Sequence, residues 1–197
     1  MQGAVPVIVV VDVEAAEADL AAGVLACPHC GGRLRPWSWA SERRVRLLDG
    51  TAAVRPRRTR CASCHGTHLP LPAWCLPRRA DAVEVVGTAL VAHAAGAGHR
   101  RIAAELGRPA STVRRWLRAV RGPHGRWLYR QGVEHTAELA PDLLADLALA
   151  PTELGDALTV LAAAVLAVGR RLGQVAPTWS LVGIVTHGRL LPPAPSG

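Results

Sequence analysis

The chain has 197 residues, half of them hydrophobic, which is enough apolar material for one packed domain or two small ones. Its formal net charge of +8 is unevenly distributed. Residues 33–130 hold 20 arginines against five acidic residues, a net +15, whereas the flanks hold three arginines against ten acids, a net −7. This segregation excludes a uniformly basic protein and indicates a central region that binds a polyanion.

At the N-terminus, the β-branched run over residues 5–11 predicts a buried strand, and Asp12 is expected to cap a helix over residues 13–22. No basic segment precedes Asp12, so the sequence shows no signal-peptide pattern. The longest apolar run, over residues 157–168, is too short to span a bilayer. We therefore expect a cytoplasmic, nucleoid-associated protein that makes no contact with a membrane.

Two C-x-x-C pairs carry the strongest chemical signal. Cys27-Pro-His-Cys30 is followed by Cys61-Ala-Ser-Cys64, and each pair presents two thiolates from a tight turn with a glycine shortly after it. Four thiolates form the closed tetrahedral shell of structural Zn²⁺. A redox site would need only one pair within a βαβ pattern, and neither condition is met. The sequence therefore predicts structural zinc at these four cysteines, in a β zinc ribbon over residues 25–77.

The segment between the cysteine pairs is β-prone around a turn at Asp49–Gly50 and is rich in arginine. Trp37 and Trp39 lie two residues apart, so on a strand they share a face. We expect both indoles to cover the core of the ribbon, with stacking on bases as the alternative. The ribbon arginines predicted to contact phosphates include Arg57, Arg58 and Arg60.

Other cysteine and histidine side chains near the predicted metal need an interpretation as well. With four cysteines available, His29, His65 and His68 are expected to support the ligands or to face solvent rather than to bind the metal. Cys75 follows Trp74 in an apolar patch, so we interpret it as a small buried side chain rather than a nucleophile.

Beyond the ribbon, the proline-rich segment 69–77 predicts an extended connector, and Asp81 is expected to cap a helix that ends near Ala95. Residues 99–121 then predict two short helices joined at Gly107, because apolar residues recur at helical spacing on both sides. This pattern is typical of a helix-turn-helix that offers its second helix to the major groove, although ordinary helical hairpins also produce it. The residues predicted to contact DNA from this unit are Arg100, Arg101, Ser111, Thr112, Arg114, Arg115 and Arg118.

The C-terminal part is acidic and rich in Ala, Leu and Val. A break at residues 122–125 precedes an arm or short helix, and Pro141 and Pro151 are expected to begin helices that run to about Ala150 and Leu172. A last helix is predicted over residues 178–187. We interpret this region as a packing module or a homodimerisation surface. The fold class is therefore α+β, with these parts: an N-terminal strand and helix (1–24), a zinc ribbon (25–77), a three-helix helix-turn-helix unit (80–122), a helical region (133–190) and a loose tail (191–197).

The order of these motifs resembles a known arrangement. CPHC, CASCHGTHLPLPAWCLP and RRIAAELGRPASTVRRWLRA follow one another as in a family of bacterial proteins that pair an N-terminal zinc ribbon with a helix-turn-helix. The same two modules are similar to the N-terminal DNA-binding region of insertion-sequence transposases. The resemblance covers residues 20–122 and implies sequence-directed DNA binding, as at the repeat ends of a mobile element. The chain departs from it at Arg108-Pro109, where a hydrophobic residue and a serine are usual, and no catalytic domain is expected after residue 121.

Transposase and recombinase chemistry needs carboxylates that hold two metal ions, or a nucleophilic Ser or Tyr in an arginine-lined core. The six acids after Arg121 fall in helical segments, and Tyr129 has no such core around it. We therefore expect a non-enzymatic, zinc-stabilised protein that binds double-stranded DNA, as a transcriptional regulator or a transposase-derived accessory factor. The alternatives are a protein-interaction adaptor for a transposase or polymerase, and a recombination enzyme acting within an oligomer.

Overall fold

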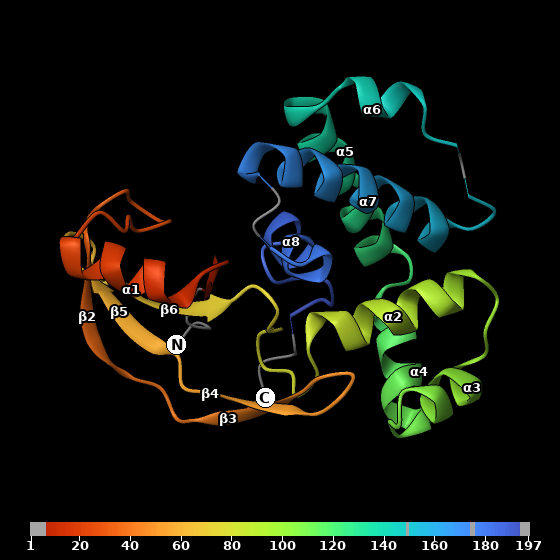
Figure 1. The fold of residues 1–197 in the computed structure, drawn as a ribbon, viewed down its shortest axis with the longest axis horizontal. Coiled ribbons are helices and arrows are strands. Elements are labelled where there is room, and N and C mark those ends of the chain that lie inside the picture. Colours follow the sequence, from red (N-terminus) through yellow and green to blue (C-terminus); the bar gives the residue numbers. More distant parts are fainter. Residues whose placement is uncertain (1–6, 149, 174–175, 194–197) are drawn as a thin grey trace.

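The computed structural model describes residues 7–148, 150–173 and 176–193, and its fold is mixed α+β (Figure 1). All strands of this described part lie in the N-terminal half of the chain, and the rest is helical. The first two residues of the predicted N-terminal strand and the last four of the predicted tail lie outside the described residues. The strands are β1 (Val7–Val10), β2 (Leu34–Trp39), β3 (Arg43–Arg46), β4 (Thr51–Val54), β5 (Arg57–Cys61) and β6 (Thr67–Pro72). The helices are α1 (Val13–Ala22), α2 (Val83–Ala94), α3 (His99–Glu105), α4 (Ala110–Ala119), α5 (Pro123–Leu139), α6 (Asp142–Ala145), α7 (Glu153–Leu172) and α8 (Thr178–Val185).

The N-terminal lobe is a four-stranded sheet in the order β1-β6-β5-β2, with α1 packed beside it (Figure 1). β1 is parallel to β6, whereas β5 is antiparallel to both of its neighbours. The predicted cap of α1 is confirmed, because the Asp12 carboxylate accepts hydrogen bonds from the backbone N–H groups of Glu14 and Ala15. The segment before the ribbon therefore completes its sheet.

The predicted connector 69–77 is extended, but its first part is a strand inside the sheet rather than a linker. β6 tolerates Pro70 and Pro72 because it pairs with β5 only through Thr67 and His68, before the prolines, and with β1 through its remaining residues. Ala73, two residues beyond Leu71, donates its N–H to Val10 of β1. Backbone N–H groups along a strand point alternately to its two neighbours, so the nitrogens of Pro70 and Pro72 point away from β1, to the side where β5 has ended. No sheet hydrogen bond is therefore lost at the two prolines.

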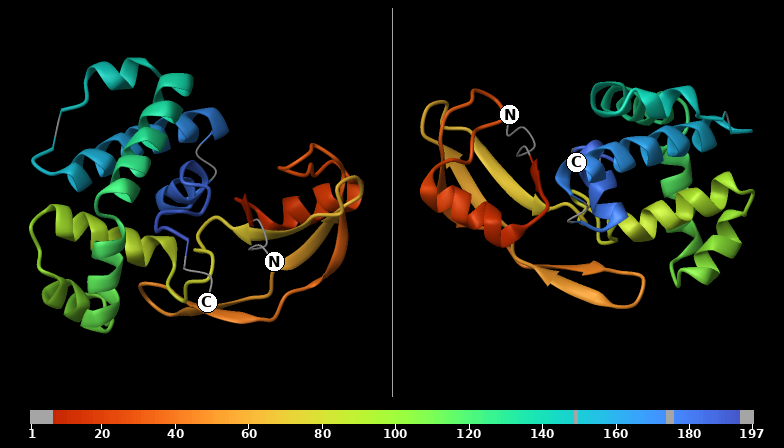
Figure 2. Two further views of the ribbon diagram at one scale, coloured as in Figure 1. Left: turned by 180° about the vertical axis from the view of Figure 1, so that it is seen from behind. Right: turned by 45° about the horizontal axis from the view of Figure 1, so that its top comes forward.

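The hairpin β3–β4 leaves the ribbon and packs beneath α2, as two views of the ribbon diagram show (Figure 1, Figure 2). Its apolar residues Val45 and Val54 belong to the same buried core as the helices. A separate small core around the cysteines contains Leu20 and Leu34. Residues 25–77 therefore contribute both to the small core around the cysteines and to the core of the helices, because the hairpin reaches from one to the other.

The helical lobe surrounds α2, which contacts α3, α4, α7 and α8. α5 and α7 form the most extensive helix pair, and they approach closely at Gly132, where a Cβ would lie 2.6 Å from a methyl group of Val160. α8 likewise lies against the backbone at Ala73, where the absent side chain of Gly183 leaves room for the Ala73 carbonyl.

The predicted helices of the C-terminal part differ from the observed ones in length. The break is shorter than predicted and ends at Gly122, because α5 already begins at Pro123 after the non-helical residues 120–122. α5 then continues through residue 133, where the composition changes, because a buried face at Leu128, Gly132 and Thr136 extends across that point. α6 is much shorter than predicted, and α8 ends at Val185 rather than His187. Within the described residues, no helix is both long and apolar enough to cross a membrane.

A candidate metal centre and an arginine-rich surface

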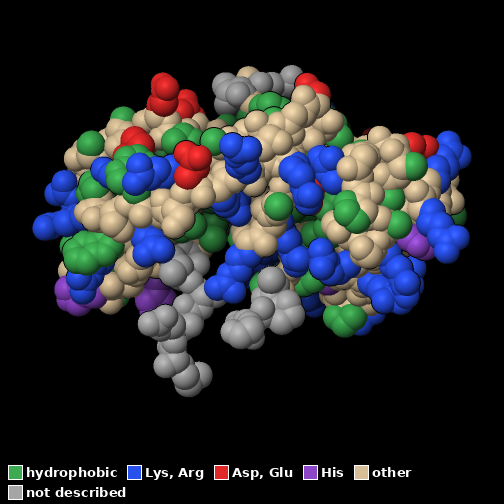
Figure 3. All heavy atoms as spheres, turned by 90° about the horizontal axis from the view of Figure 1, so that it is seen from below, with side chains coloured by type: hydrophobic (Ala, Val, Ile, Leu, Met, Phe, Trp, Pro, Cys, Tyr) green, Lys and Arg blue, Asp and Glu red, His purple; other side chains and the backbone are tan. Residues whose placement is uncertain are grey.

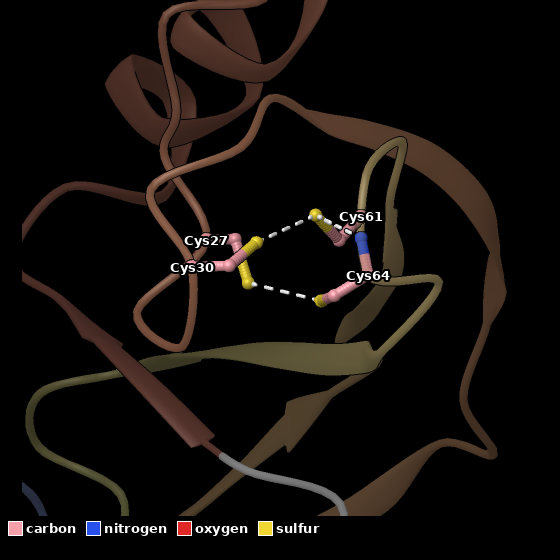
Figure 4. A group of neighbouring side chains, drawn as sticks. All are labelled: Cys27, Cys30, Cys61 and Cys64. Atoms are coloured by element: carbon pink, nitrogen blue, oxygen red, sulfur yellow. Dashed lines mark hydrogen bonds between the residues drawn. The ribbon is translucent and has the colours of Figure 1, made fainter.

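Four cysteines far apart in sequence form one cluster (Figure 4). Cys27 and Cys30 lie in the loop between α1 and β2, while Cys61 ends β5 and Cys64 follows in the turn to β6. All four sulfur atoms lie within 4.8 Å of one another. Cys30 and Cys61 are 3.5 Å apart and Cys27 and Cys64 are 3.8 Å apart, sulfur to sulfur. A tetrahedral zinc ion with Zn–S bonds of about 2.3 Å places its sulfurs about 3.8 Å apart, so the cluster fits such an ion.

The backbone of the turn after β5 is arranged to stabilise negative sulfur. The N–H groups of Ser63 and Cys64 donate to the Cys61 sulfur at 3.4 and 3.5 Å. These donors, that of Cys64 foremost, lower the pKa of Cys61 to about 6. The pKa of Cys64 rises to about 12, because the Gly66 N–H that lowers it is outweighed by the adjacent thiols, Cys30 first. Four sulfurs this close therefore ionise together only around a cation.

One histidine contacts the cluster. The imidazole of His68 is 2% exposed, and its Nε2 lies 3.2 Å from the Cys27 sulfur. Burial, and then the nearby charge of His29, lower the pKa of His68, which favours a neutral ring that donates from Nε2 to the sulfur. His29 and His65 are exposed. The prediction that these histidines support the ligands or face solvent agrees with this arrangement.

Cys75 is buried away from the cluster, and burial raises the pKa of its thiol to about 11. A thiol with that pKa is largely protonated at neutral pH and is a poor nucleophile. The interpretation of Cys75 as a small core side chain agrees with both observations.

The prediction that Trp37 and Trp39 cover the ribbon's core is wrong. Their side chains are exposed, at 60% and 47%, and a bulge between Pro36 and Ser38 shifts the register of β2 between them. Arg60 lies over the Trp37 ring, 4.8 Å from its centroid, and Arg57 lies over Trp39 at 4.3 Å. The small core needs no indole because the cysteines, Leu20 and Leu34 already fill it.

The predicted role of Asp81 as the cap of α2 is also wrong. The N-cap is Ala82, and it makes no side-chain cap hydrogen bond. Instead, the carboxylate of Asp81 is buried and binds two arginines. Arg46 on β3 contacts it with two nitrogens, at 2.9 and 2.6 Å, and Arg108 in the α3–α4 turn contacts it at 2.8 Å.

Arg108 extends this ionic cluster into the backbone on both sides. Its guanidinium donates to the carbonyl of Leu47 in the hairpin at 2.7 Å and to that of Leu106 in the turn at 3.0 Å. The residue at which the sequence departs from the usual turn pattern is therefore the one that joins the α3–α4 turn to the ribbon. Asp81 is one of only five acids in the basic middle of the chain, and that rarity was the available signal for its role.

α3 and α4 form the predicted helix pair. Gly107 in the turn has φ +60°, a left-handed conformation that glycine adopts without steric cost. The second helix, α4, buries Val113, Trp116 and Leu117 against the core. Four residues predicted to contact DNA are exposed on its outer side, and Thr112 is half-buried. The four exposed residues are Ser111, Arg114, Arg115 and Arg118.

The remaining predicted contacts lie in two places. Arg100 and Arg101 are exposed in the first turn of α3, where Arg101 pairs with Glu105 at 2.8 Å. On the ribbon, Arg58 is exposed, whereas Arg57 pairs with Glu17 at 3.6 Å. Seen from the side on which β3, β4 and α4 lie, arginines are spread over both the ribbon end and the helical end of the molecule (Figure 3).

One further arginine, Arg79, is half-buried and was not among the predicted DNA contacts. Burial, and then the positive charge of Arg115 on α4, lower the pKa of Arg79. Its guanidinium also donates to the carbonyl of Pro192 at 3.1 Å and so ties the C-terminal segment to this surface. Its position after the proline-rich segment gave no periodic pattern that could relate it to Arg115, much later in the sequence.

Comparison with known proteins finds a match to one family model and indicates no activity. Residues 27–116 match the family model of a domain of unknown function (DUF6431). No curated protein and no solved structure matches the chain. The matched segment begins at the first cysteine of the cluster and ends inside α4, so it includes the cysteine cluster, the hairpin, α3 and most of α4.

Proposed function

We propose that this protein is a non-catalytic, zinc-stabilised protein that binds double-stranded DNA, with α3 and α4 as a helix-turn-helix and α4 as its recognition helix. The observation that carries the proposal is the division of α4 into a buried apolar side and an exposed arginine side. An α-helix fits the major groove, and arginine is the side chain that most often binds guanine edges and phosphates.

The turn chemistry supports the same assignment. Gly107 allows a sharp change of direction, and Arg108 holds the turn to the hairpin, so α4 is fixed in orientation relative to the ribbon. A fixed recognition helix loses little conformational freedom on binding, which favours affinity. Arg79, which the charge of Arg115 affects, and the exposed arginines of the ribbon would add phosphate contacts.

The metal in this proposal is structural zinc. Cys27, Cys30, Cys61 and Cys64 would fill all four positions around a tetrahedral Zn²⁺ ion, which would leave no open position for a substrate or an activated water. Zinc bound there would cross-link the two cysteine loops and neutralise the charge of the thiolates. Two of the four ligands, Cys27 and Cys61, are also part of the small apolar core, so the metal site and that core form together.

The proposal is tested by DNA binding as a function of salt. With a mixed-sequence duplex of about 30 base pairs, log K should fall linearly with log salt between about 50 and 200 mM NaCl, because each phosphate contact releases counterions. Arg115→Ala should weaken binding by about 1–3 kcal/mol and, if it contacts a phosphate, reduce the slope by about one.

Arg171→Ala is the matched control, because Arg171 is an equally exposed arginine at the end of α7, outside the proposed DNA-binding unit. Its duplex affinity and salt slope should equal those of the unchanged protein. An affinity that does not vary with salt, or equal effects of the two substitutions, would contradict the proposal.

A further inference from the structure

The edge of the ribbon sheet carries an exposed indole, that of Trp37, which belongs to neither hydrophobic core. β2 is an outer strand, and the bulge between Pro36 and Ser38 turns Trp37 outward until its side chain is 60% exposed. The guanidinium of Arg60 lies over the ring, 4.8 Å from its centroid. An indole of that exposure with a single cation over it retains open ring surface for a planar partner.

The side chains around Trp37 are cationic. Arg35 lies opposite Arg60 in the register of β2 and β5, and Arg58 lies two residues from Arg60, so all three project from the same face of the strand pair. The other face carries the buried residues Thr59 and Cys61. Within the described part of the chain, none of the ion pairs involves Arg35, Arg58 or Arg60.

We propose that the ribbon face formed by Trp37, Arg35, Arg58 and Arg60 binds unpaired nucleotides, with one base stacked on the Trp37 ring and the arginines on the flanking phosphates. This inference rests on the proposed function, because it places a single-stranded segment next to the duplex that α4 holds. The bases of a duplex have their faces covered by their neighbours, so only an unpaired base can stack on the indole.

Charge favours a nucleic acid over a protein partner. Three arginines around one indole, with no acid paired to them, match a polymer that alternates phosphates with planar bases. This face lies in the lobe that shares the arginine-rich side of the molecule with α4 (Figure 3). In the proposal, a strand of DNA leaves the duplex at α4 and continues along the ribbon.

The test compares three probes with the full, zinc-loaded chain: a blunt duplex of about 30 base pairs, the same duplex with an oligo(dT) extension of about ten nucleotides, and the oligo(dT) alone. The extension should raise affinity about tenfold over the blunt duplex, the effect of one stacked base. Trp37→Leu should abolish that gain and leave the affinity for the blunt duplex unchanged, whereas Trp37→Phe should keep most of it.

Trp39→Leu is the matched control. Trp39 lies on the same strand and is also exposed, but it lies opposite Arg57 in register and so belongs to the other face, beside α1. This substitution should leave the gain from the extension intact.

Equal affinities for blunt and extended duplexes would overturn the inference, as would equal losses in the two Trp→Leu variants. Failure of the proposed function is a different result, since the blunt duplex would then not bind even at low salt. Binding of oligo(dT) that depends on Trp37 without any duplex binding would keep the ribbon site and refute the role of α4.

Discussion

Asp81 binds two guanidinium groups that lie 35 and 27 residues away in the sequence. Its side chain is 5% exposed, and that of Arg108 is 12% exposed, so this pair is shielded from water while the Arg46 side chain reaches the surface. A buried charge whose partner is removed loses its compensation, whereas an exposed pair contributes little. The stability of the turn between α3 and α4 therefore depends on one carboxylate.

We predict that Asp81→Ala lowers the free energy of unfolding by about 2–4 kcal/mol, because it leaves the Arg108 guanidinium without its ionic partner. Urea unfolding followed by circular dichroism measures the change. Glu105→Ala is the control, since it removes an exposed partner of Arg101 and should cost less than about 1 kcal/mol. Equal losses in the two variants would show that Asp81 contributes no more than a surface pair.

At the scale of elements, α5 and α7 lie in contact because glycine occupies the closest point. A Cβ on Gly132 would lie 2.6 Å from a Val160 methyl carbon and 2.7 Å from the Val160 carbonyl carbon. The backbone of α7 cannot yield as a flexible side chain can, so a larger residue must separate the two helices.

We therefore predict that Gly132→Ala destabilises the protein by about 1–3 kcal/mol, although alanine is the better helix former. Thermal unfolding should show a lowered Tm. Glu134→Ala, an exposed change on the same helix, should leave the Tm nearly unchanged. An increase in Tm for Gly132→Ala would mean that helix propensity outweighs the close approach.

Sequence patterns predicted the elements whose determinants are local. Asp12 caps α1 and Gly107 lies in a left-handed turn, because each depends on residues a few positions apart. The two C-x-x-C pairs meet although they lie about thirty residues apart, and the local spacing within each pair was enough to predict their cluster. Prediction failed where a partner distant in sequence decides. Asp81 would be a good cap if Arg46 and Arg108 were elsewhere, and Trp37 would follow simple alternation if β2 had no bulge.

At the scale of the whole molecule, the cysteine cluster and the helical lobe are connected through the hairpin β3–β4. The hairpin leaves the sheet that carries the cysteine cluster, and its residues Val45 and Val54 belong to the core of the helical lobe. Loss of a metal bound at the cluster would release the two cysteine loops, and with them the strands β2 and β5 from which the hairpin extends. Ribbon and helices should therefore lose structure together.

We predict that a zinc chelator reduces duplex affinity at least about tenfold and lowers the Tm, although the proposed recognition helix contains no zinc ligand. Metal analysis of the untreated protein should give one zinc per chain. Added zinc should restore both properties, and magnesium should not. Unchanged DNA binding after complete removal of zinc would show that α3 and α4 act without the ribbon.

The contact of Arg108 with Leu47 also has a geometric consequence for DNA. In the proposed function, a joint that holds the ribbon at a set angle to α4 would keep the ribbon arginines and α4 at a fixed spacing along the double helix. Inserting about five base pairs, half a helical turn, between the two contacted regions of a selected site should abolish the contribution of one of them, and inserting about ten should restore part of it. The spacing preferred within the DNA site would then depend on Asp81, whose carboxylate holds Arg108 and contacts no DNA.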